Sequence, residues 1–373
     1  MPNEVLKPPV TASSSLSAQY KQGGAWYKQT KGTLTRSVSV DPGLILCREV
    51  DRRPQSSRPL DRPNCCSARN MATRLYFEGH AAASRYAATR PTMSAEILRI
   101  ITSSLEKRVA HSEEDSASNM VDSEDRDSHF RIKKPWKLAT DVGCGSGQYT
   151  QPLAPYFRRV LGFDASETQI QKANALKTAE NVAYSVSPAE SLPVDSGSVD
   201  LVLSATAAHW FDFPRFCAEV HRVLRPGGCL VVLGCVQERF PHQVATISAK
   251  LMEINDSFLN DKDQLGPYWP MTRAEMKAFY DNMDIDYTDQ VRPAGISIRR
   301  TMNVDDFIEY TKTISASFQH LQCCPDTDLY EKHRRRLMAL LSSSAGEKAS
   351  DVNLTVEWVV QMMLAHKPGN ADS

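Results

Sequence analysis

The 373-residue sequence has no excess charge of either sign, because 44 Lys and Arg balance 44 Asp and Glu. Without a basic excess it has no general attraction for phosphate backbones, which counts against a nucleic-acid partner. It also lacks long apolar runs: the stretch from Leu230 to Leu233 falls far short of the roughly 20 residues that span a bilayer. No apolar segment follows Met1, so we expect neither a secretory signal nor a membrane partner.

The cysteines lack the spacing that is typical of disulfide-bonded domains or zinc sites. The nine cysteines are odd in number, include the adjacent pairs Cys65-Cys66 and Cys323-Cys324, and form no C-x-x-C motif. This pattern argues against a disulfide framework and against a zinc site. We therefore predict reduced thiols, no bound metal and a cytoplasmic location.

Composition divides the chain in two. Residues 1–70 contain runs of proline, serine and glycine without a sustained helix or strand period, which predicts a disordered N-terminal extension. An organelle transit peptide is an alternative for its acid-poor start, and whether the mature protein retains it is open. Residues 71–373 form the second predicted domain, in which the acidic run at 111–129 is a loop insertion.

Short apolar strands alternate with helices from residue 136 onward. The sequence predicts strands at 138–142, 160–163, 182–186, 199–204 and 229–233, and a closing strand at 354–364. Strands that alternate with helices form a parallel sheet through right-handed crossovers, with helices on both faces. The predicted fold class is therefore α/β, a Rossmann-like doubly wound sheet.

Polar and glycine residues follow these strands at the end where such a sheet binds its ligand. The first strand ends in Asp141, and three glycines follow at alternate positions: Gly143, Gly145 and Gly147. Glycine lets the backbone turn tightly and lets a ligand approach closely. Gln148 stands where a dinucleotide-binding G-x-G-x-x-G loop needs its third glycine, which disfavours a nicotinamide dehydrogenase. Asp164 ends the second strand, where a carboxylate can accept both hydroxyls of a ribose.

Five segments in this order resemble the class I S-adenosylmethionine-dependent methyltransferases, in particular the small-molecule branch that includes trans-aconitate methyltransferase. They are the loop Asp141–Gly147, Asp164, Ala189-Glu190-x-Leu192-Pro193, Asp200-Leu201-Val202 and Leu224-Arg225-Pro226-Gly227-Gly228. The resemblance covers Leu75 to about Lys367. It implies a sheet of about seven strands, the last antiparallel, a cofactor-binding core at 136–235, and a helical lid built from 71–108 and 236–320.

The resemblance also implies roles in binding S-adenosyl-L-methionine. The three glycines would lie under the methionine moiety, Asp141 would hold its ammonium group and Asp164 its ribose diol. The residue at the start of the fourth-strand loop, Ser204 or Ala205, would face the methionyl end.

The adenine side carries one departure from the family. Ala189 and Glu190 would border the adenine, as the resemblance implies. Pro188 stands where many relatives have an acid or serine. Because proline lacks an N–H and a polar side chain, a hydrogen bond to the adenine from that position is in doubt.

Methyl transfer is an in-line displacement at a sulfonium, so the enzyme chiefly aligns the acceptor and excludes water. A carboxylate acceptor needs no general base, whereas a hydroxyl, an amine or a carbon acid needs one. His209 is the candidate base and Trp210 a candidate pocket wall, unless both simply pack beneath the lid. Tyr86 and Arg90 could reach the acceptor from the lid, where an arginine favours a carboxylate.

The sequence thus predicts a methyltransferase that uses S-adenosyl-L-methionine and a small-molecule acceptor, a carboxylic acid being one candidate. A catalytically silent binding protein and a methyltransferase of RNA or protein stay open as alternatives. The latter is disfavoured by the neutral charge and by Ala205-Thr206-Ala207-Ala208, where an Asn/Asp-Pro-Pro-aromatic signature would stand. The sequence leaves the acceptor atom and the oligomeric state unknown.

Overall fold

The computed structural model describes residues 18–22, 25–30, 33–41, 44–48, 80–114, 135–345 and 352–369. The chain divides into two compact units, Met1–Asp61 and Arg62–Ser373. In the described part of the chain, no helix combines the length and the apolar character needed to cross a bilayer.

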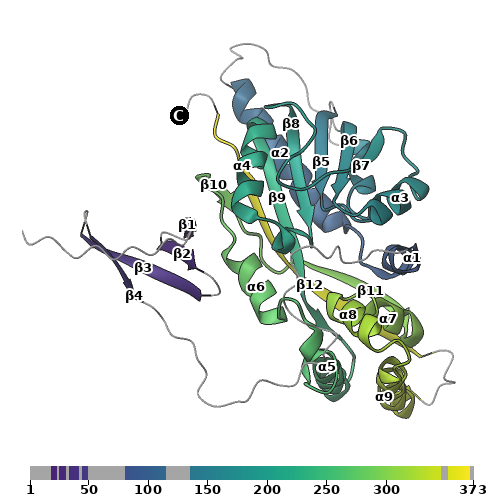
Figure 1. Cartoon of the computed structure of the whole chain (residues 1–373). Helices are drawn as coiled ribbons and strands as arrows, with labels where there is room; N and C mark the ends of the chain where they lie inside the picture. The colour runs from purple at the N-terminus through teal and green to yellow at the C-terminus, as the bar shows by residue number, and fades with distance from the viewer. Residues whose placement is uncertain are drawn as a thin grey trace, which may run out of the picture. The chain divides into compact units, whose positions relative to one another are not determined.

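The first unit contains an antiparallel four-stranded sheet, coloured purple in Figure 1. Its strands are β1 (Ala18–Gln22), β2 (Ala25–Thr30), β3 (Thr33–Asp41) and β4 (Leu44–Arg48). The prediction of disorder for residues 1–70 is wrong where these strands lie, and the rest of that range is outside the described residues. The overlooked signal is a two-residue link with glycine between successive strands, which is typical of hairpins: Gly23-Gly24, Lys31-Gly32 and Pro42-Gly43.

The second unit is built on an eight-stranded sheet in the order β10-β12-β9-β8-β5-β6-β7, with β11 paired to β12 (Figure 1). The strands are β5 (Trp136–Val142), β6 (Phe157–Asp164), β7 (Val182–Val186), β8 (Val199–Ala205), β9 (Leu224–Arg239), β10 (Asp289–Val291), β11 (Ser297–Asn303) and β12 (Asn353–His366). Strands β5 to β9 pair in parallel, and β12 is antiparallel to its neighbours. The α/β class and the antiparallel last strand are confirmed. The sheet exceeds the predicted seven strands because β10 and β11 both pair with β12.

Helices cover both faces of this sheet. Helix α2 (Ala95–Glu114) buries Ile97, Ile101 and Leu105 against one face, and α4 (Phe213–Val223) buries Phe216, Val220 and Val223 in a second apolar cluster. In each helix the buried residues are three or four apart, which places them on one side. Neighbouring residues of β8, such as Leu201 and Val202, belong to different clusters, as expected of opposite faces.

This packing corrects two predicted boundaries. Helix α2 contacts β9, so it covers the sheet and is not part of the lid predicted over 71–108. It also continues to Glu114, four residues into the predicted loop insertion at 111–129. Residues 115–134 lie outside the described residues.

A helical part extends the unit beyond the carboxyl ends of the parallel strands. It contains α5 (Ala245–Asn260), α6 (Arg273–Asn282), α7 (Val304–Thr311), α8 (Ser315–Cys323) and α9 (Leu329–Ala345). Figure 1 shows α5, α7, α8 and α9 gathered at its lower end, with α9 beyond the predicted lid boundary at 320. Helix α1 (His80–Thr89) contacts both α7 and α3 (Glu167–Ala175), and so bridges this part and the sheet.

The packing of α9 on α5 contains an unsatisfied polar side chain. His333 is 2% exposed and stacks on Phe258 with ring centroids 3.9 Å apart. Neither ring nitrogen has a hydrogen-bond partner among the described residues, and burial, aided by the charge of Arg336, lowers the His333 pKa to about 3. Because a desolvated polar group without a partner costs about 1–3 kcal/mol, we expect His333→Leu to raise the free energy of unfolding by roughly 1 kcal/mol in urea titrations.

The pH dependence of the same measurement provides a second readout. The unfolded state takes up the His333 proton near pH 6.5 and the folded state near pH 3, so wild-type stability falls as the pH drops through this window. The His333→Leu variant should lose less stability there. His366→Leu is the matched control and should be destabilised, because His366 is buried and its Nε2 lies 3.3 Å from Ser104 Oγ. Equal or lower stability for His333→Leu at pH 7 would contradict this account.

Candidate functional site

A pocket lies where the strand order of the sheet reverses. Strand β5 has β6 on one side and β8 on the other. From β5 the sheet continues through β6 to β7 on one side and through β8 to β9 on the other, so the strand order reverses at β5. The glycine loop follows β5 and residues 206–212 follow β8. The pocket between these loops and the helical part contains about 930 Å³ of empty space, counting the solvent at its mouth. Open α/β sheets bind ligands at this position.

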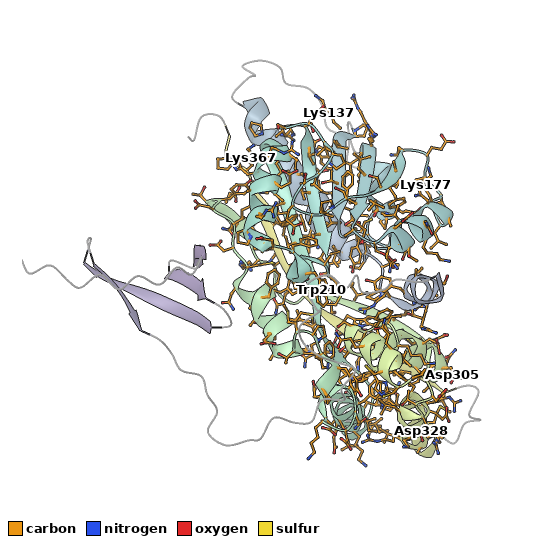
Figure 2. All side chains as sticks on the ribbon, in the orientation of Figure 1. Lys137, Lys177, Trp210, Asp305, Asp328 and Lys367 are labelled. Atoms are coloured by element: carbon orange, nitrogen blue, oxygen red, sulfur yellow. The ribbon has the colours of Figure 1, made fainter. Side chains whose placement is uncertain are left out.

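The pocket brings together predicted residues from three segments far apart in the sequence. They are Tyr86, Arg90, Asp141, Gly143, Ala205, His209 and Trp210. Figure 2 labels Trp210 at the junction between the sheet and the helical part, and its side chain is 40% exposed. The remaining predicted residues do not line this pocket: Gly145, Gly147, Asp164, Ala189, Glu190 and Ser204. Of the alternatives Ser204 and Ala205, the structure places Ala205 in the pocket and buries Ser204 within β8.

The glycine loop is shaped by close neighbours. A Cβ atom on Gly143 would lie 2.4 Å from the Cβ of Ala207, and one on Gly147 would lie 2.3 Å from the Tyr184 hydroxyl. Both glycines also have positive φ angles, +70° and +91°, which side chains rarely adopt. The turn therefore requires glycine at these two positions.

Asp164 fastens this loop to the end of β6. Its Oδ2 accepts a hydrogen bond from the Gly145 N–H at 2.8 Å, and its Oδ1 accepts one from the Ser166 N–H at 2.9 Å. Ser166 also caps helix α3, because its Oγ accepts a hydrogen bond from the Gln169 N–H at 3.2 Å. Each carboxylate oxygen can accept a second hydrogen bond, so the ribose role of Asp164 stays a prediction.

Asp141 places a carboxylate with unused capacity in the pocket. The residue is 1% exposed, and its Oδ2 accepts a hydrogen bond from the Thr150 hydroxyl at 2.6 Å. Its Oδ1 is buried with no hydrogen-bond partner in the structure. Burial raises the Asp141 pKa to about 7, against the Thr150 hydrogen bond and with the help of the Asp164 charge. A buried acceptor of this kind is costly unless a donor, best a cationic one, reaches it.

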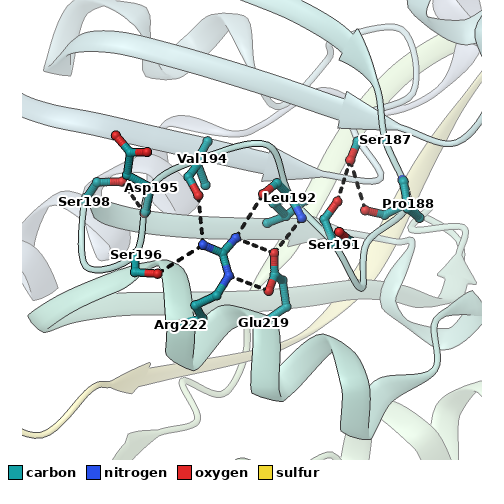
Figure 3. A network of polar contacts seen from close by, with 10 residues as sticks. All are labelled: Ser187, Pro188, Ser191, Leu192, Val194, Asp195, Ser196, Ser198, Glu219 and Arg222. Atoms are coloured by element: carbon teal, nitrogen blue, oxygen red, sulfur yellow. Dashed lines mark hydrogen bonds and ion pairs between the residues drawn. The ribbon is translucent and has the colours of Figure 1, made fainter.

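The loop that carries Ala189 and Glu190 is clamped by α4, as Figure 3 shows. Arg222 donates hydrogen bonds to the carbonyls of Leu192 and Val194, both at 2.9 Å. Glu219 accepts from the Leu192 N–H at 2.6 Å and pairs with Arg222, whose hydrogen bond lowers the Glu219 pKa.

The two predicted adenine neighbours are accounted for by contacts within the protein. Ala189 is buried in an apolar cluster, and Glu190 Oε1 accepts from the Asp212 N–H at 2.8 Å. Their adenine contact stays a prediction.

His209 lies in the pocket, but its environment argues against the predicted role of general base. Its Nδ1 and the Tyr280 hydroxyl share a hydrogen bond of 2.8 Å, and its ring lies 4.8 Å from that of Trp210. Burial, and after it the charge of Arg90, lowers the His209 pKa to about 3. A base this weak is poorly matched to removing a proton from a hydroxyl or an amine near pH 7. The neutral imidazole is a hydrogen-bonding part of the wall.

A polar wall on the side of the helical part was not predicted from the sequence. Glu238 accepts hydrogen bonds from Arg273 Nη2 at 2.5 Å and from the Tyr310 hydroxyl at 2.7 Å, and Trp358 Nε1 donates to the Tyr310 oxygen at 2.8 Å. Burial alone would raise the Glu238 pKa, but Arg273 outweighs burial and holds it below its ordinary value. These residues lie on β9, α6, α7 and β12, so no local pattern joins them.

One local signal could have located Arg273. Thr272 and Glu275 form a complete capping box at the start of α6, which makes Arg273 the first helical residue. The motif T-x-x-E is readable in the sequence.

Arg90 and Thr206 complete the pocket. The Arg90 guanidinium lies 5.0 Å from the Tyr86 ring and 5.4 Å from the Tyr310 ring, and its Nη2 donates to the Thr313 carbonyl at 2.7 Å. Its Nε is buried and has no hydrogen-bond partner in the part of the chain that the structure describes. Thr206 has a φ of +55°, which a non-glycine residue seldom adopts and which is typical of ligand sites.

Comparison with known proteins agrees with this geometry. The family described as "Methyltransferase domain" matches residues 140–232. A Dictyostelium discoideum protein provisionally named as a methyltransferase is 33% identical over 234 residues, which cover 63% of this chain and 84% of the relative. This chain belongs to the class I S-adenosylmethionine-dependent methyltransferases. The family resemblance inferred from the sequence motifs is thereby confirmed.

Two further similarities were found for this methyltransferase, one to a curated protein and one to a solved structure. Trans-aconitate 2-methyltransferase of Deinococcus radiodurans is 34% identical over 125 residues, 32% of this chain and 47% of the relative. The solved structure of a provisionally assigned type II methyltransferase from Anaeromyxobacter dehalogenans is 27% identical, with a TM-score of 0.51. That match covers 62% of this chain and 91% of the solved one.

The usual cofactor of these methyltransferases fits the pocket residues. S-adenosylmethionine carries an ammonium group, and Asp141 Oδ1 is a buried acceptor without a partner. Gly143 lines the same pocket. The acceptor type and the charge of Asp141 thus agree with the methionyl end of this cofactor.

The clamp on the 187–198 loop generates a test of how firmly α4 holds it. Arg222→Ala removes the donors to Leu192 and Val194, so we expect the amide hydrogen of Leu192 to exchange about tenfold faster or more. Arg215→Ala is the matched control, since Arg215 is an exposed arginine on the same helix. Unchanged exchange in Arg222→Ala, or equal acceleration in both variants, would show that the clamp does not order the loop.

Proposed function

We propose that this methyltransferase binds S-adenosyl-L-methionine and transfers its methyl group to a small-molecule acceptor, with carboxylic acids the favoured class. The observation that carries the proposal is the unpartnered Oδ1 of Asp141 in the pocket at the reversal point of the sheet.

The loops of the sheet would hold the cofactor, which supplies an electrophilic methyl group on a positively charged sulfur. Asp141 accepts hydrogen bonds from the ammonium, the glycine turn at Gly143 lies beside the methionyl backbone, and Asp164 accepts from the ribose hydroxyls. Ala205 presents only a methyl group to the methionyl end, so it allows a close approach.

The helical part would hold the acceptor. Tyr86 in α1, Arg90 just after α1, and His209 and Trp210 in the loop after β8 would complete the acceptor wall opposite that part. Alignment of the nucleophile and exclusion of water are the main requirements of the step. The histidine of this wall is too weak a base for acceptors that must lose a proton, which favours an acceptor already ionised at neutral pH. The name of the trans-aconitate relative points to the same class.

A catalytically silent cofactor-binding protein is the second candidate. It is favoured by Pro188, which offers no N–H at a position that polar residues occupy in many relatives.

Cofactor binding can be tested through the protonation of Asp141. Asp141→Asn should weaken the binding of S-adenosylhomocysteine, measured by calorimetry, about 10- to 100-fold, because it removes a charged hydrogen-bond acceptor. In the wild type only the ionised carboxylate attracts the ammonium, so affinity should fall below pH 7, by up to about tenfold per pH unit, and level off above it. The variant should show no such pH dependence.

Asp195→Asn, at an exposed turn, is the control and should bind as the wild type does. Tight, pH-independent binding by Asp141→Asn would refute the assigned ammonium site.

Activity can be tested by incubating the protein and a cell extract with methyl-labelled cofactor. We expect label in a low-molecular-weight product, because the acceptor wall lies inside a pocket. A labelled small product would exclude the silent-protein candidate, whereas label confined to protein or RNA would overturn the small-molecule assignment.

A further inference from the structure

We propose that the acceptor is a monocarboxylate with an apolar body. The ion pair between Glu238 and Arg273 sets the preference for a single carboxylate, because Glu238 neutralises the charge of Arg273 and leaves Arg90 to bind the acceptor. This inference rests on the proposed function and names the substrate class of the same site.

The charges along the pocket come first. Among the lining residues that the structure describes, the permanently cationic side chains are Arg90 and Arg273. Arg273 Nη2 lies 2.5 Å from Glu238 Oε2, with side chains 16% and 8% exposed. Glu238 stays ionised there because Arg273 holds its pKa low. The pair is therefore neutral as a unit, and an acceptor anion near Arg273 would also meet the Glu238 carboxylate.

Arg90 differs from Arg273 because its partners are neutral. It donates to the Thr313 carbonyl and lies against two tyrosine rings, while its Nε–H is buried without a partner. Among the described residues the guanidinium thus forms no ion pair with a carboxylate, and it has an unused donor. One carboxylate satisfies both the charge and this donor through paired hydrogen bonds, which arginine geometry favours.

Arg90 contacts the helical part of the pocket. Its guanidinium lies 5.4 Å from the Tyr310 ring and donates to the Thr313 carbonyl, and its charge contributes to lowering the His209 pKa. Tyr86, which Arg90 also contacts, lies between this side and the glycine loop, since its pKa responds to Asp164 and Asp141 as well as to Arg90. The carboxylate of the cofactor is bonded to the same carbon as its ammonium, so a group that held it would lie beside Asp141. Arg90 is therefore assigned to the acceptor.

The rest of the wall suits an uncharged body, because it is largely apolar or aromatic and its polar side chains, Gln148, Thr206 and Ser315, are neutral. Trp210, Trp269, Met276 and Ile314 line the pocket, and the exposed fraction of Trp210 leaves part of its ring open to contact. A tricarboxylate would match one charge at Arg90 and place the others against these side chains or against Glu238. Unpaired buried charges are disfavoured, so the wall selects against such acids.

The step balances without a proton donor or acceptor. A carboxylate oxygen attacks the methyl carbon as the carbon–sulfur bond breaks, and the electron pair of that bond stays on sulfur. The products are a methyl ester and S-adenosylhomocysteine. A carboxylate and a sulfonium thereby become two groups without formal charge, and the imidazole of His209 need not change its protonation.

The charge of the labelled product tests the class directly. The labelled-methyl product should carry no remaining carboxylate, should extract into organic solvent at pH 8, and should release its label as methanol in mild alkali. A product that keeps an ionised carboxylate, or whose label resists alkali, would overturn the inference. Failure of the wild type to bind S-adenosylhomocysteine would instead refute the proposed function.

A matched pair of acids tests the role of Glu238. Benzylmalonate is 3-phenylpropanoate with one more carboxylate on the carbon beside the first. With S-adenosylhomocysteine present, we expect the wild type to bind 3-phenylpropanoate at least about tenfold more tightly than benzylmalonate. Glu238→Gln frees the charge of Arg273 and should shift this ratio toward benzylmalonate by about tenfold or more.

The double variant Glu238→Gln/Arg273→Gln covers the case in which the single variant does not fold, because it removes both buried charges together. It should retain the preference for 3-phenylpropanoate, since Arg90 is untouched. Calorimetry with S-adenosylhomocysteine verifies folding in each variant. Preference of the wild type for benzylmalonate, an unchanged ratio in a folded Glu238→Gln variant, or loss of the preference in a folded double variant would each overturn the role of the pair.

Discussion

A buried carboxylate with one unused oxygen is the interaction on which this site depends. Asp141 ends the central strand β5, where the sheet and its helices exclude water, and Thr150 satisfies only one of its two oxygens. Leaving the other oxygen unpaired costs stability, and the structure partly relieves that cost by raising the Asp141 pKa. A cationic ligand would remove the conflict by pairing with the ionised form, so an unfavourable feature of the fold becomes a source of affinity.

The fold places opposite charges on the two sides of one pocket. The end of strand β5 supplies Asp141, while the chain just after α1 supplies Arg90, whose guanidinium is held by a carbonyl and two aromatic rings. The ammonium of the cofactor would thus bind on one side of the pocket and an anionic acceptor on the other, with the methyl group between them. The neutral pair of Glu238 and Arg273 completes the wall without adding net charge. The main feature of this site is therefore the arrangement of its charges: an acid on one side of the pocket, an arginine with neutral partners on the other, and a neutral ion pair in the wall.

Features set by neighbouring residues could be predicted from the sequence, and features set by distant packing could not. The parallel strands and the glycine turn after Asp141 follow from local periodicity and backbone geometry, and the structure contains them. The pairing of Glu238 with Arg273 depends on β9 and α6 meeting in space. The strained backbone of Thr206 and the low pKa of His209 likewise arise from neighbours far along the chain. The strands of residues 18–48 were missed for another reason: the proline, serine and glycine runs around them resemble the composition of a disordered segment.

The most direct test of the central claim is a crystal structure of the protein with S-adenosylhomocysteine. The account predicts the amino nitrogen of the ligand within about 3 Å of Asp141 Oδ1, in hydrogen-bond geometry, with the ribose hydroxyls at Asp164. A ligand bound with its amino group away from Asp141, or bound outside the crevice between β5 and β8, would contradict it.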